Sequence, residues 1–308
     1  MTLSDEKLKN FLNLLWLRPE NALLGVFKSD AYSHIPFESP SLDISCGDGL
    51  FTFLHLGGEL DPDFDYFQST KSNNFTHSNF VDIYNHIDDN YSVPILKKPI
   101  IKIDYGIDWK QSLIDKASKL DLYKNLLVHD NNQLPLPFDN NSFRTIYSNS
   151  VYWVNDSAAL IDDIYRIVQP GGEVILELAT PYFYETLDDL QNILSEEAIT
   201  ILDRKRRETS PGLKTFSEWK EIMENSNFTI AEIKSVYPNK LLLDIWNIGL
   251  RPISHLLIQM SDNLTLEKRG AIKKEWVEIF FTLFRSLLKL EQTYSMEKAP
   301  YIMFRLKK

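Results

Sequence analysis

Short apolar runs alternate along the chain with segments in which apolar residues recur every three or four positions. The runs lie at 41–45, 99–106, 125–130, 144–150 and 173–178. Each has the length and composition of a buried strand, and the intervening segments predict helices, including those at 5–17, 110–119 and 157–168. Strands separated by helices predict an α/β fold with a mostly parallel sheet and helices on both of its faces.

Two segments lie outside this alternation. Residues 57–98 form a polar insertion rich in Asp, Asn and Ser, and residues 240–298 form a helical block ahead of a closing strand at 301–308. The longer helix of that block carries an apolar face, which we expect to pack on the protein: Ile272, Trp276, Ile279, Phe280, Leu283, Leu287 and Leu290. We therefore expect one domain over 1–308, with the block as a cap and a core at 40–180, 210–239 and 299–308.

Composition narrows the function. A net charge of −10 over 308 residues is unlike the basic footprint of a duplex-binding protein, so no nucleic-acid partner is expected. The single cysteine, Cys46, excludes an intrachain disulfide and a multi-cysteine zinc site, and it suits a cytoplasmic protein. The most apolar stretch, 241–260, is interrupted by charged residues and Pro252, which favours a pair of buried or interfacial helices over a membrane span.

The stretch SLDISCGDGLF, residues 41–51, places two glycines where the first strand turns into a helix. Gly47 and Gly49 allow a tight turn and a close approach of a ligand to the main chain. In open α/β sheets ligands bind beyond the carboxyl ends of the strands, where this corner falls. On its own, a G-x-G is equally consistent with a merely structural turn.

Two acids follow the next strands of the predicted sheet. Asp108 stands between a strand and a helix, where a carboxylate accepts hydrogen bonds from both hydroxyls of a ribose, although it also suits a helix N-cap. Asp130 follows the third strand, where an acid accepts a hydrogen bond from the exocyclic amine of a base. Together with the glycine corner, these acids predict a nucleoside-containing ligand.

Four segments in this order resemble the class I S-adenosylmethionine-dependent methyltransferases, nearest the small-molecule group that includes the ubiquinone-biosynthesis C-methyltransferases. They are LDISCGDG, GIDWKQSLIDKA, HDNNQLPLPFDNNSF and IVQPGGEVILEL, with a looser likeness in TFSEWKEIMENSNF. The resemblance implies a Rossmann-like seven-stranded sheet, S-adenosylmethionine as cofactor, and methyl transfer to a small-molecule or envelope/lipid-type metabolite. It also implies that Pro170-Gly171-Gly172 is a structural turn.

The resemblance assigns the methionine half of the cofactor to the corner. Asp43 and the main chain of Ser45, Cys46 and Gly47 would surround it, and Gly49 would allow the close start of the helix. Ser148, at the end of the fourth strand, would lie near the sulfonium. Ser45 stands where the family usually has glycine, which predicts weaker cofactor binding. We interpret Cys46 as a packing residue rather than a nucleophile.

The adenosine half is assigned to the next two strands. Asp108 would hold the ribose hydroxyls, and Trp109 would cover one face of the adenine. Asp130 would accept from the adenine amine, with the Asn131 backbone beside it. The spacing from the glycine corner to Asp108 is longer than in the family because 57–98 intervenes, so this assignment depends on the local match.

Aromatic residues follow the fourth and fifth strands, beside the expected position of the transferable methyl group. Tyr152, Trp153, Tyr182 and Tyr184 are candidates for the acceptor pocket, with core packing as the alternative. The sequence identifies no catalytic residue and no serine-histidine-acid set; His55 and His129 are candidate bases or structural histidines. In-line placement against an activated sulfonium supplies much of the rate without one.

Charged segments leave alternatives open. The basic run RKRRE, 204–208, suits an anionic substrate or a solvated helix face, and Arg18 suits the cofactor carboxylate or a salt bridge. The acidic DPDFD at 61–65 lacks the glycine and glutamate of a calcium loop, so no metal is expected. The helical block suits an acceptor lid, a dimer face or a peripheral lipid contact.

Two other functions compete with methyl transfer. A nicotinamide-dependent oxidoreductase would need a third glycine at the position of Leu50, and the chain has none there. A non-catalytic binding or partner subunit on the same fold is motivated by Ser45 and by the long insertion.

Overall fold

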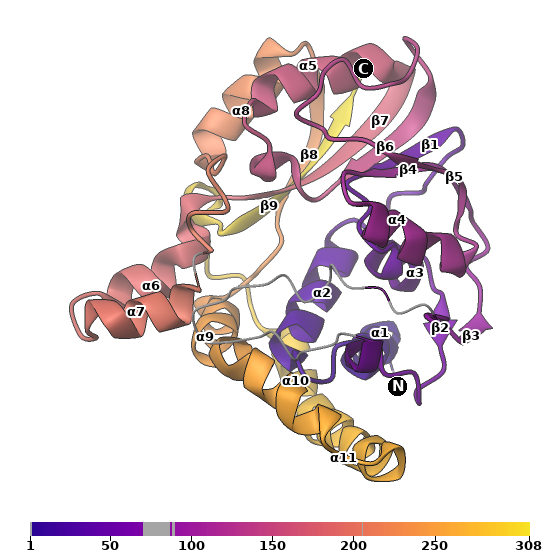
Figure 1. The fold of residues 1–308 in the computed structure, drawn as a ribbon. Coiled ribbons are helices and arrows are strands. Elements are labelled where there is room, and N and C mark those ends of the chain that lie inside the picture. Colours follow the sequence, from indigo (N-terminus) through magenta and orange to yellow (C-terminus); the bar gives the residue numbers. More distant parts are fainter. Residues whose placement is uncertain (1, 70–86, 88–89, 205) are drawn as a thin grey trace.

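A computed structural model describes residues 2–69, 87, 90–204 and 206–308, and its centre is a seven-stranded sheet (Figure 1). The strands are β1 (Ser41–Ile44), β4 (Ile103–Asp108), β5 (Tyr123–Val128), β6 (Phe143–Ser148), β7 (Val168–Ala179), β8 (Thr229–Ser235) and β9 (Tyr301–Lys307). Their order is β5-β4-β1-β6-β7-β9-β8, with β9 antiparallel to both of its neighbours and the other pairings parallel. The predicted mostly parallel seven-stranded sheet is confirmed.

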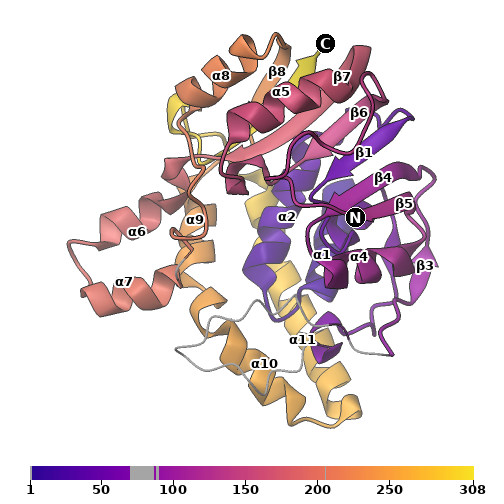
Figure 2. The ribbon, with the colours of Figure 1, turned by 45° about the horizontal axis from the view of Figure 1, so that its top comes forward.

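Helices cover both faces of the sheet, as predicted. Helices α5 (Ser157–Ile167) and α8 (Phe216–Asn225) lie together on one face, while α2 (Pro19–Ala31), α3 (Leu50–His55) and α4 (Gln111–Ala117) lie on the other (Figure 2). Helix α5 begins where the Asp156 side chain accepts the Ala159 N–H, and it buries the apolar stripe that its spacing predicts. Helix α8 begins with a reciprocal capping box between Thr215 and Glu218.

The structure moves two predicted boundaries. The strand expected at 99–106 starts only at Ile103 and runs to Asp108, which brings that acid into the last position of β4. The Pro170-Gly171-Gly172 segment is a bulge inside β7 rather than a turn before it, because Phe143 pairs with Val168 and Thr145 already pairs with Glu173. In the polar insertion 57–98, a short β2 (Glu59–Leu60) pairs with β3 (Ile95–Lys97); residues 70–86, 88 and 89 lie outside the described part.

The N-terminus contributes two helices to the region beyond the sheet. Helix α1 (Leu3–Leu14) agrees with the prediction over 5–17, whereas α2 was not predicted. Helix α2 buries most of its residues, so its sequence lacks the polar stripe that would mark it as a surface helix. Pro19 at its first turn is the signal that was available.

The C-terminal block follows β8 as α9 (Lys240–Ile248), α10 (Ser254–Asp262) and α11 (Leu266–Arg285). The stretch Lys240–Asp262 is long and apolar enough to span a membrane, with a mean hydropathy of 1.2. The structure breaks it between α9 and α10 by a 3-10 turn at Arg251–Ile253, so the predicted pair of helices is confirmed. Helices α6 (Glu185–Leu190) and α7 (Glu196–Asp203) precede the basic run. Short 3-10 helices lie at Tyr66–Ser69, Ser118–Leu120, Val151–Trp153, Pro181–Tyr184, Ser286–Lys289 and Met296–Lys298.

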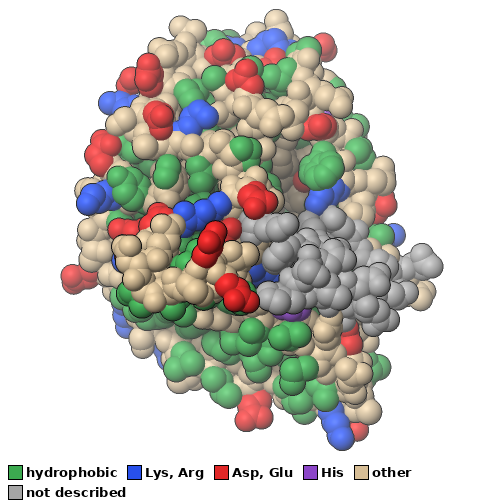
Figure 3. All heavy atoms as spheres, turned by 60° about the vertical axis from the view of Figure 1, so that its left-hand side comes forward, with side chains coloured by type: hydrophobic (Ala, Val, Ile, Leu, Met, Phe, Trp, Pro, Cys, Tyr) green, Lys and Arg blue, Asp and Glu red, His purple; other side chains and the backbone are tan. Residues whose placement is uncertain are grey.

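The predicted inward face of α11 is wrong in part. Ile272, Ile279 and Leu283 are exposed, and the buried residues of this helix are instead Arg269, Lys273, Val277, Phe281 and Phe284. Two cations turn inward because they have partners in the loop after β2: Arg269 pairs with Asp65, and the Lys273 ammonium donates to the carbonyls of Pro62 and Phe64. Hydrophobic side chains consequently gather on the outer surface at this end of the molecule (Figure 3).

Candidate active site

The glycine corner has two glycines with different reasons to be there. Both adopt positive φ, +58° at Gly47 and +75° at Gly49. A Cβ at Gly49 would lie 2.8 Å from the Tyr123 ring, so this glycine permits the close start of α3 against β5. A Cβ at Gly47 would meet nothing within 4 Å, so the main chain there borders open space that a ligand can enter.

Asp108 is held directly against this corner. The Gly47 N–H donates to Asp108 Oδ2 at 3.1 Å, and the Lys110 N–H donates to Oδ1 at 3.0 Å. Burial raises the pKa of Asp108, while the two backbone donors oppose that shift. Each oxygen keeps a lone pair after these bonds, so the carboxylate organises the chain before α4 and can still accept from two hydroxyls.

The loop after β5 meets the corner at Ser45. Ser45 has φ +59°, in the left-handed region that glycine adopts most readily. Its Oγ accepts a 2.7 Å hydrogen bond from Asn131 Nδ2. The other side-chain atom of Asn131, Oδ1, is buried and has no hydrogen-bond partner in the described part of the chain. Asp130 Oδ1 accepts from the backbone and side chain of Asn132, both at 2.9 Å. The predicted ligand residues of three strand ends therefore meet in one place.

Trp109 stands apart from these contacts. Its side chain is 62% exposed, and the Lys110 ammonium lies 4.9 Å from its ring. The exposed indole next to Asp108 is available to stack on a base. Its predicted role, to cover the adenine of the cofactor, stays a prediction.

Three predicted residues lie behind the corner rather than at its open side. Asp43 Oδ2 accepts hydrogen bonds from the hydroxyls of Tyr123 and Thr52, each at 2.7 Å, and burial raises the pKa of Asp43 to about 6. Ser148 is fully buried and donates to the Ile44 carbonyl at 3.0 Å. Burial and the charges of neighbouring acids raise the pKa of the Cys46 thiol well above its usual range, which agrees with a packing role.

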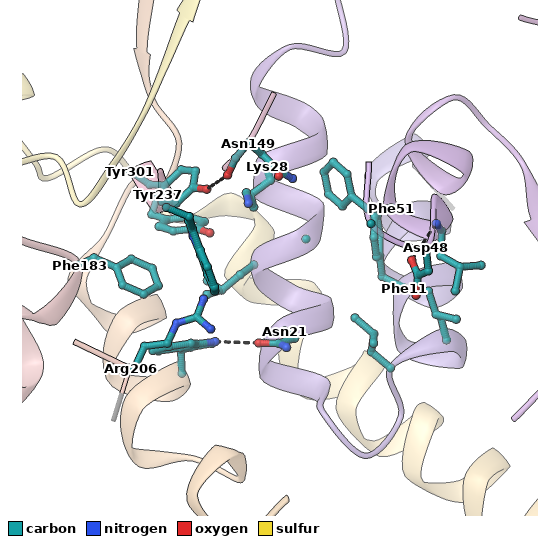
Figure 4. A pocket seen from close by; sticks show the side chains of 18 of the residues that line it. Phe11, Asn21, Lys28, Asp48, Phe51, Asn149, Phe183, Arg206, Tyr237 and Tyr301 are labelled. Atoms are coloured by element: carbon teal, nitrogen blue, oxygen red, sulfur yellow. Dashed lines mark hydrogen bonds between the residues drawn. The ribbon is translucent and has the colours of Figure 1, made fainter. Parts of the chain in front are cut away.

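A cavity of about 460 Å³ adjoins the corner (Figure 4). It starts at Gly47 and Asp48, passes Asn21 and Lys28 of α2, and ends among aromatic side chains of several elements. These are Tyr152, Trp153, Phe183, Tyr237, Trp246 and Tyr301. A volume of this size with mostly apolar walls and a few polar groups is typical of a small-molecule site.

Two of the four candidate acceptor residues line this cavity and two do not. Tyr152 and Trp153 line it, as predicted, whereas Phe183 lines it in place of Tyr182 and Tyr184. The 3-10 helix at Pro181–Tyr184 turns successive side chains to different sides, and the buried Tyr184 hydroxyl instead donates to Ser210 at 3.5 Å.

The two candidate histidine bases do not reach the cavity. His55 is buried against Tyr32 and bonded to Ser29, and burial lowers its pKa to about 3. His129 Nε2 is bonded to the Gln133 carbonyl at 3.0 Å. Both therefore have structural roles.

Several polar residues of the cavity were not predicted. Asp48 lies between the two glycines and accepts a 2.6 Å hydrogen bond from the Tyr66 hydroxyl. The Lys28 ammonium stands 4.5 Å from the Tyr301 ring and 5.8 Å from the Phe51 ring. Asp48 was visible as an acid inside the motif, but α2 reaches the cavity only through tertiary packing, so no local pattern marked Lys28.

Part of the chain matches a known protein family. Residues 92–176 match a family model described as a methyltransferase domain. An S-adenosylmethionine-dependent methyltransferase from Thermotoga maritima is similar with 12% identity and a TM-score of 0.47, covering 92% of this chain and 89% of that one. Geranyl diphosphate C-methyltransferase from Streptomyces coelicolor is similar with 10% identity and a TM-score of 0.42, covering 94% and 83%. No curated protein matches the chain significantly.

The seven-stranded sheet contains the segment that matches the methyltransferase-domain model. In this sheet the antiparallel β9 lies between β7 and β8. The glycine corner follows the carboxyl end of β1. Residues 92–176 therefore carry the likeness to a methyltransferase domain. The resemblance drawn from the sequence is confirmed at this level, and its likeness to the ubiquinone-biosynthesis group stays a prediction.

Proposed function

We propose that the protein is an S-adenosylmethionine-dependent methyltransferase that acts on a small-molecule or envelope/lipid-type metabolite. The observation that carries the proposal is the open side of Gly47, which is hydrogen-bonded to Asp108 and leads directly into the aromatic cavity. Binding at the glycine corner would therefore place a transferable group next to a space of small-molecule size.

The residues present fit the cofactor at both of its ends. Asp108 offers lone pairs for the ribose hydroxyls, and the buried, unpartnered Asn131 Oδ1 is an acceptor that a bound nucleoside could satisfy. At the methionine end, Asp48, next to Gly47, suits the ammonium group, and Lys28, which lines the same cavity between the Phe51 and Tyr301 rings, suits the carboxylate. The cofactor, when bound, supplies an activated methyl group on a sulfonium.

The contribution of the chain is mainly placement. The aromatic end of the cavity offers ring faces, which attract a sulfonium or other cation. Burial raises the pKa of the Tyr301 phenol well above its usual range, so this hydroxyl stays protonated and serves as a hydrogen-bonding group rather than a base. Holding acceptor and methyl donor in line is then the main source of rate.

Methyl-labelled S-adenosylmethionine tests the proposal. The purified protein is incubated with it and with a panel of oxygen, nitrogen and carbon acceptors, and label in the acceptor is measured together with S-adenosylhomocysteine release. We expect transfer to at least one acceptor. Cofactor binding with no transfer across the panel would favour the non-catalytic alternative, and preferential binding of NADH would favour the oxidoreductase.

A further inference from the structure

Arg206 is a cation at the aromatic end of the cavity. It belongs to the basic run after α7 and lies near Phe183 and Tyr237 (Figure 4). Its guanidinium is 4.8 Å from the Trp153 ring and 5.9 Å from the Trp246 ring. Within the described residues this guanidinium has no carboxylate partner and no hydrogen-bond acceptor. The next residue differs: Arg207 pairs with Asp188 at 2.7 Å.

The surroundings of Arg206 add further positive charge. Arg251 is buried, lies 4.3 Å from the same Trp246 ring, and donates to the neutral carbonyls of Leu202 and Asp203. Arg204 donates to the Arg251 carbonyl at 3.1 Å. Burial and the charges of Arg18, Arg206 and Arg204 together lower the pKa of Arg251 to about 9, with the Asp203 carboxylate opposing them. Arg18 is itself paired with Glu20, so the charge that favours an anion here is that of Arg206 beside the buried Arg251.

Counting charges assigns this anion to the acceptor rather than to the cofactor. S-adenosylmethionine carries one carboxylate, and Lys28 of α2, whose ammonium lies 4.5 Å from the Tyr301 ring and 5.8 Å from the Phe51 ring, is a second cation in the cavity that can pair with it. Arg206 stands at the end of the cavity opposite the glycine corner, beyond α2 and Asn21 (Figure 4). A cofactor with a positive sulfonium leaves the charge of Arg206 uncompensated, so the second ligand of the cavity has to supply the negative charge.

We propose that Arg206 binds an oxyanion of the acceptor, a carboxylate or a phosphate, while the apolar body of the acceptor lies against Phe183, Tyr237 and Trp246. The identity of this ligand as the acceptor rests on the proposed function. The guanidinium lies near two indole rings, at 4.8 and 5.9 Å, and its planar set of N–H donors suits bidentate binding of an oxyanion.

Three probes that share a naphthalene ring test the proposal: 2-naphthoate, 2-naphthyl phosphate and the neutral 2-naphthamide, which is close in shape to the naphthoate. Their affinities for the full-length protein are measured by calorimetry, with and without S-adenosylhomocysteine. We expect at least one anion to bind about tenfold more tightly than the amide, since a charge-assisted bond is lost with the neutral probe. The comparison of naphthoate with naphthyl phosphate identifies which oxyanion the site prefers.

Variants at neighbouring positions identify the residue responsible. Arg206→Gln should remove the preference for the anion, leave the affinity for the amide within about twofold, and leave S-adenosylhomocysteine binding unchanged. Arg206→Lys should restore part of the preference, and the matched control Arg207→Gln should retain all of it. Thermal unfolding confirms that each variant is folded.

Three results would overturn the proposal. The first is equal affinity of the wild-type protein for the anions and the amide, and the second is no binding of any probe by a protein that binds S-adenosylhomocysteine. The third is a loss of S-adenosylhomocysteine affinity in Arg206→Gln as large as its loss of anion affinity. The last would place Arg206 at the cofactor carboxylate. If the wild-type protein ignores S-adenosylhomocysteine but prefers the anionic probes through Arg206, the anion site stands and the proposed function fails.

Discussion

Two regions of the molecule are built in different ways: the edge of the sheet at the carboxyl ends of β1, β4 and β5, called the edge below, and the helices and loops around the cavity, called the cap below. At the edge, residues close to strand ends meet through short local bonds, such as those from Gly47 to Asp108 and from Asn131 to Ser45. The cap brings α1 and α2 together with the C-terminal helices, and a buried ion pair joins Arg269 of α11 to Asp65 in the loop after β2. The edge is thus defined by sequence motifs, and the cap by tertiary packing.

The largest expected effect tests whether polar contacts hold the cap. Arg269 is 3% exposed and bonds Asp65, Asp262 and Ser261. Arg269→Met should lower the free energy of unfolding by about 3–5 kcal/mol, because it leaves the buried Asp65 carboxylate unpaired. Chemical denaturation measures this.

The exposed Ile279 of the same helix provides the control. Ile279→Ala should change the free energy of unfolding by less than about 0.5 kcal/mol, because its side chain is 50% exposed. Equal losses in the two variants would mean that the apolar face faces inward, as the sequence alone suggested.

The two glycines of the corner separate stability from binding. Gly49→Ala should destabilise the protein by about 3 kcal/mol, because it adds a contact of 2.8 Å with Tyr123 to a positive φ. Gly47→Ala should cost only about 1 kcal/mol in stability yet weaken S-adenosylhomocysteine binding about tenfold, since its methyl group enters open space. Denaturation and calorimetry on both variants check this, and the reverse pattern would move the ligand away from Gly47.

The buried acid Glu177 predicts how stability depends on pH. Burial raises the pKa of Glu177 to about 7, with the Lys28 charge and the Tyr147 hydrogen bond opposing the shift. The folded state therefore holds a proton that the unfolded state releases near pH 4.5. The contribution of Glu177 to the free energy of unfolding falls by roughly 3 kcal/mol as the pH rises from 4.5 to 7.

Glu177→Gln should remove this part of the pH dependence. Asp43, with its own pKa near 6, should retain a smaller decline between pH 4 and 6 in the variant. Unfolding measured from pH 4.5 to 8 gives both curves, and identical slopes would show that Glu177 ionises as it does in water.

The smallest expected effect concerns Ser45. Ser45→Gly relieves left-handed strain of about 1 kcal/mol but loses the hydrogen bond with Asn131, which contributes about as much, so stability should change little. Ser45→Ala keeps the strain and loses the bond, and it should lower stability by about 1 kcal/mol. Denaturation of the pair compares the two contributions, and a large gain from glycine would show that strain prevails at this corner.

The sequence predicted the edge well and the cap poorly for the same physical reason. Strand periodicity and the glycine corner act over a few residues, so the sheet and the meeting of Gly47 with Asp108 could be inferred. Lys28 enters the cavity through packing between distant segments, and no local pattern marks it. The basic run 204–208 was a candidate for an anionic substrate, but the sequence did not show which of its residues would line the cavity. The inward turn of Lys273 depends on carbonyls 209 and 211 residues away, so hydrophobic periodicity was wrong for Ile272, Ile279 and Leu283 of α11.

S-adenosylhomocysteine binding by calorimetry is the most direct test of the central claim that the edge holds the cofactor. The account predicts that the wild-type protein binds it and that Asp61→Ala, in the loop after β2, binds equally well. Asp108→Ala should bind about a hundredfold more weakly, because two charge-assisted hydrogen bonds to the ribose are lost. Folded wild-type protein that does not bind, or equal effects of the two substitutions, would contradict the account.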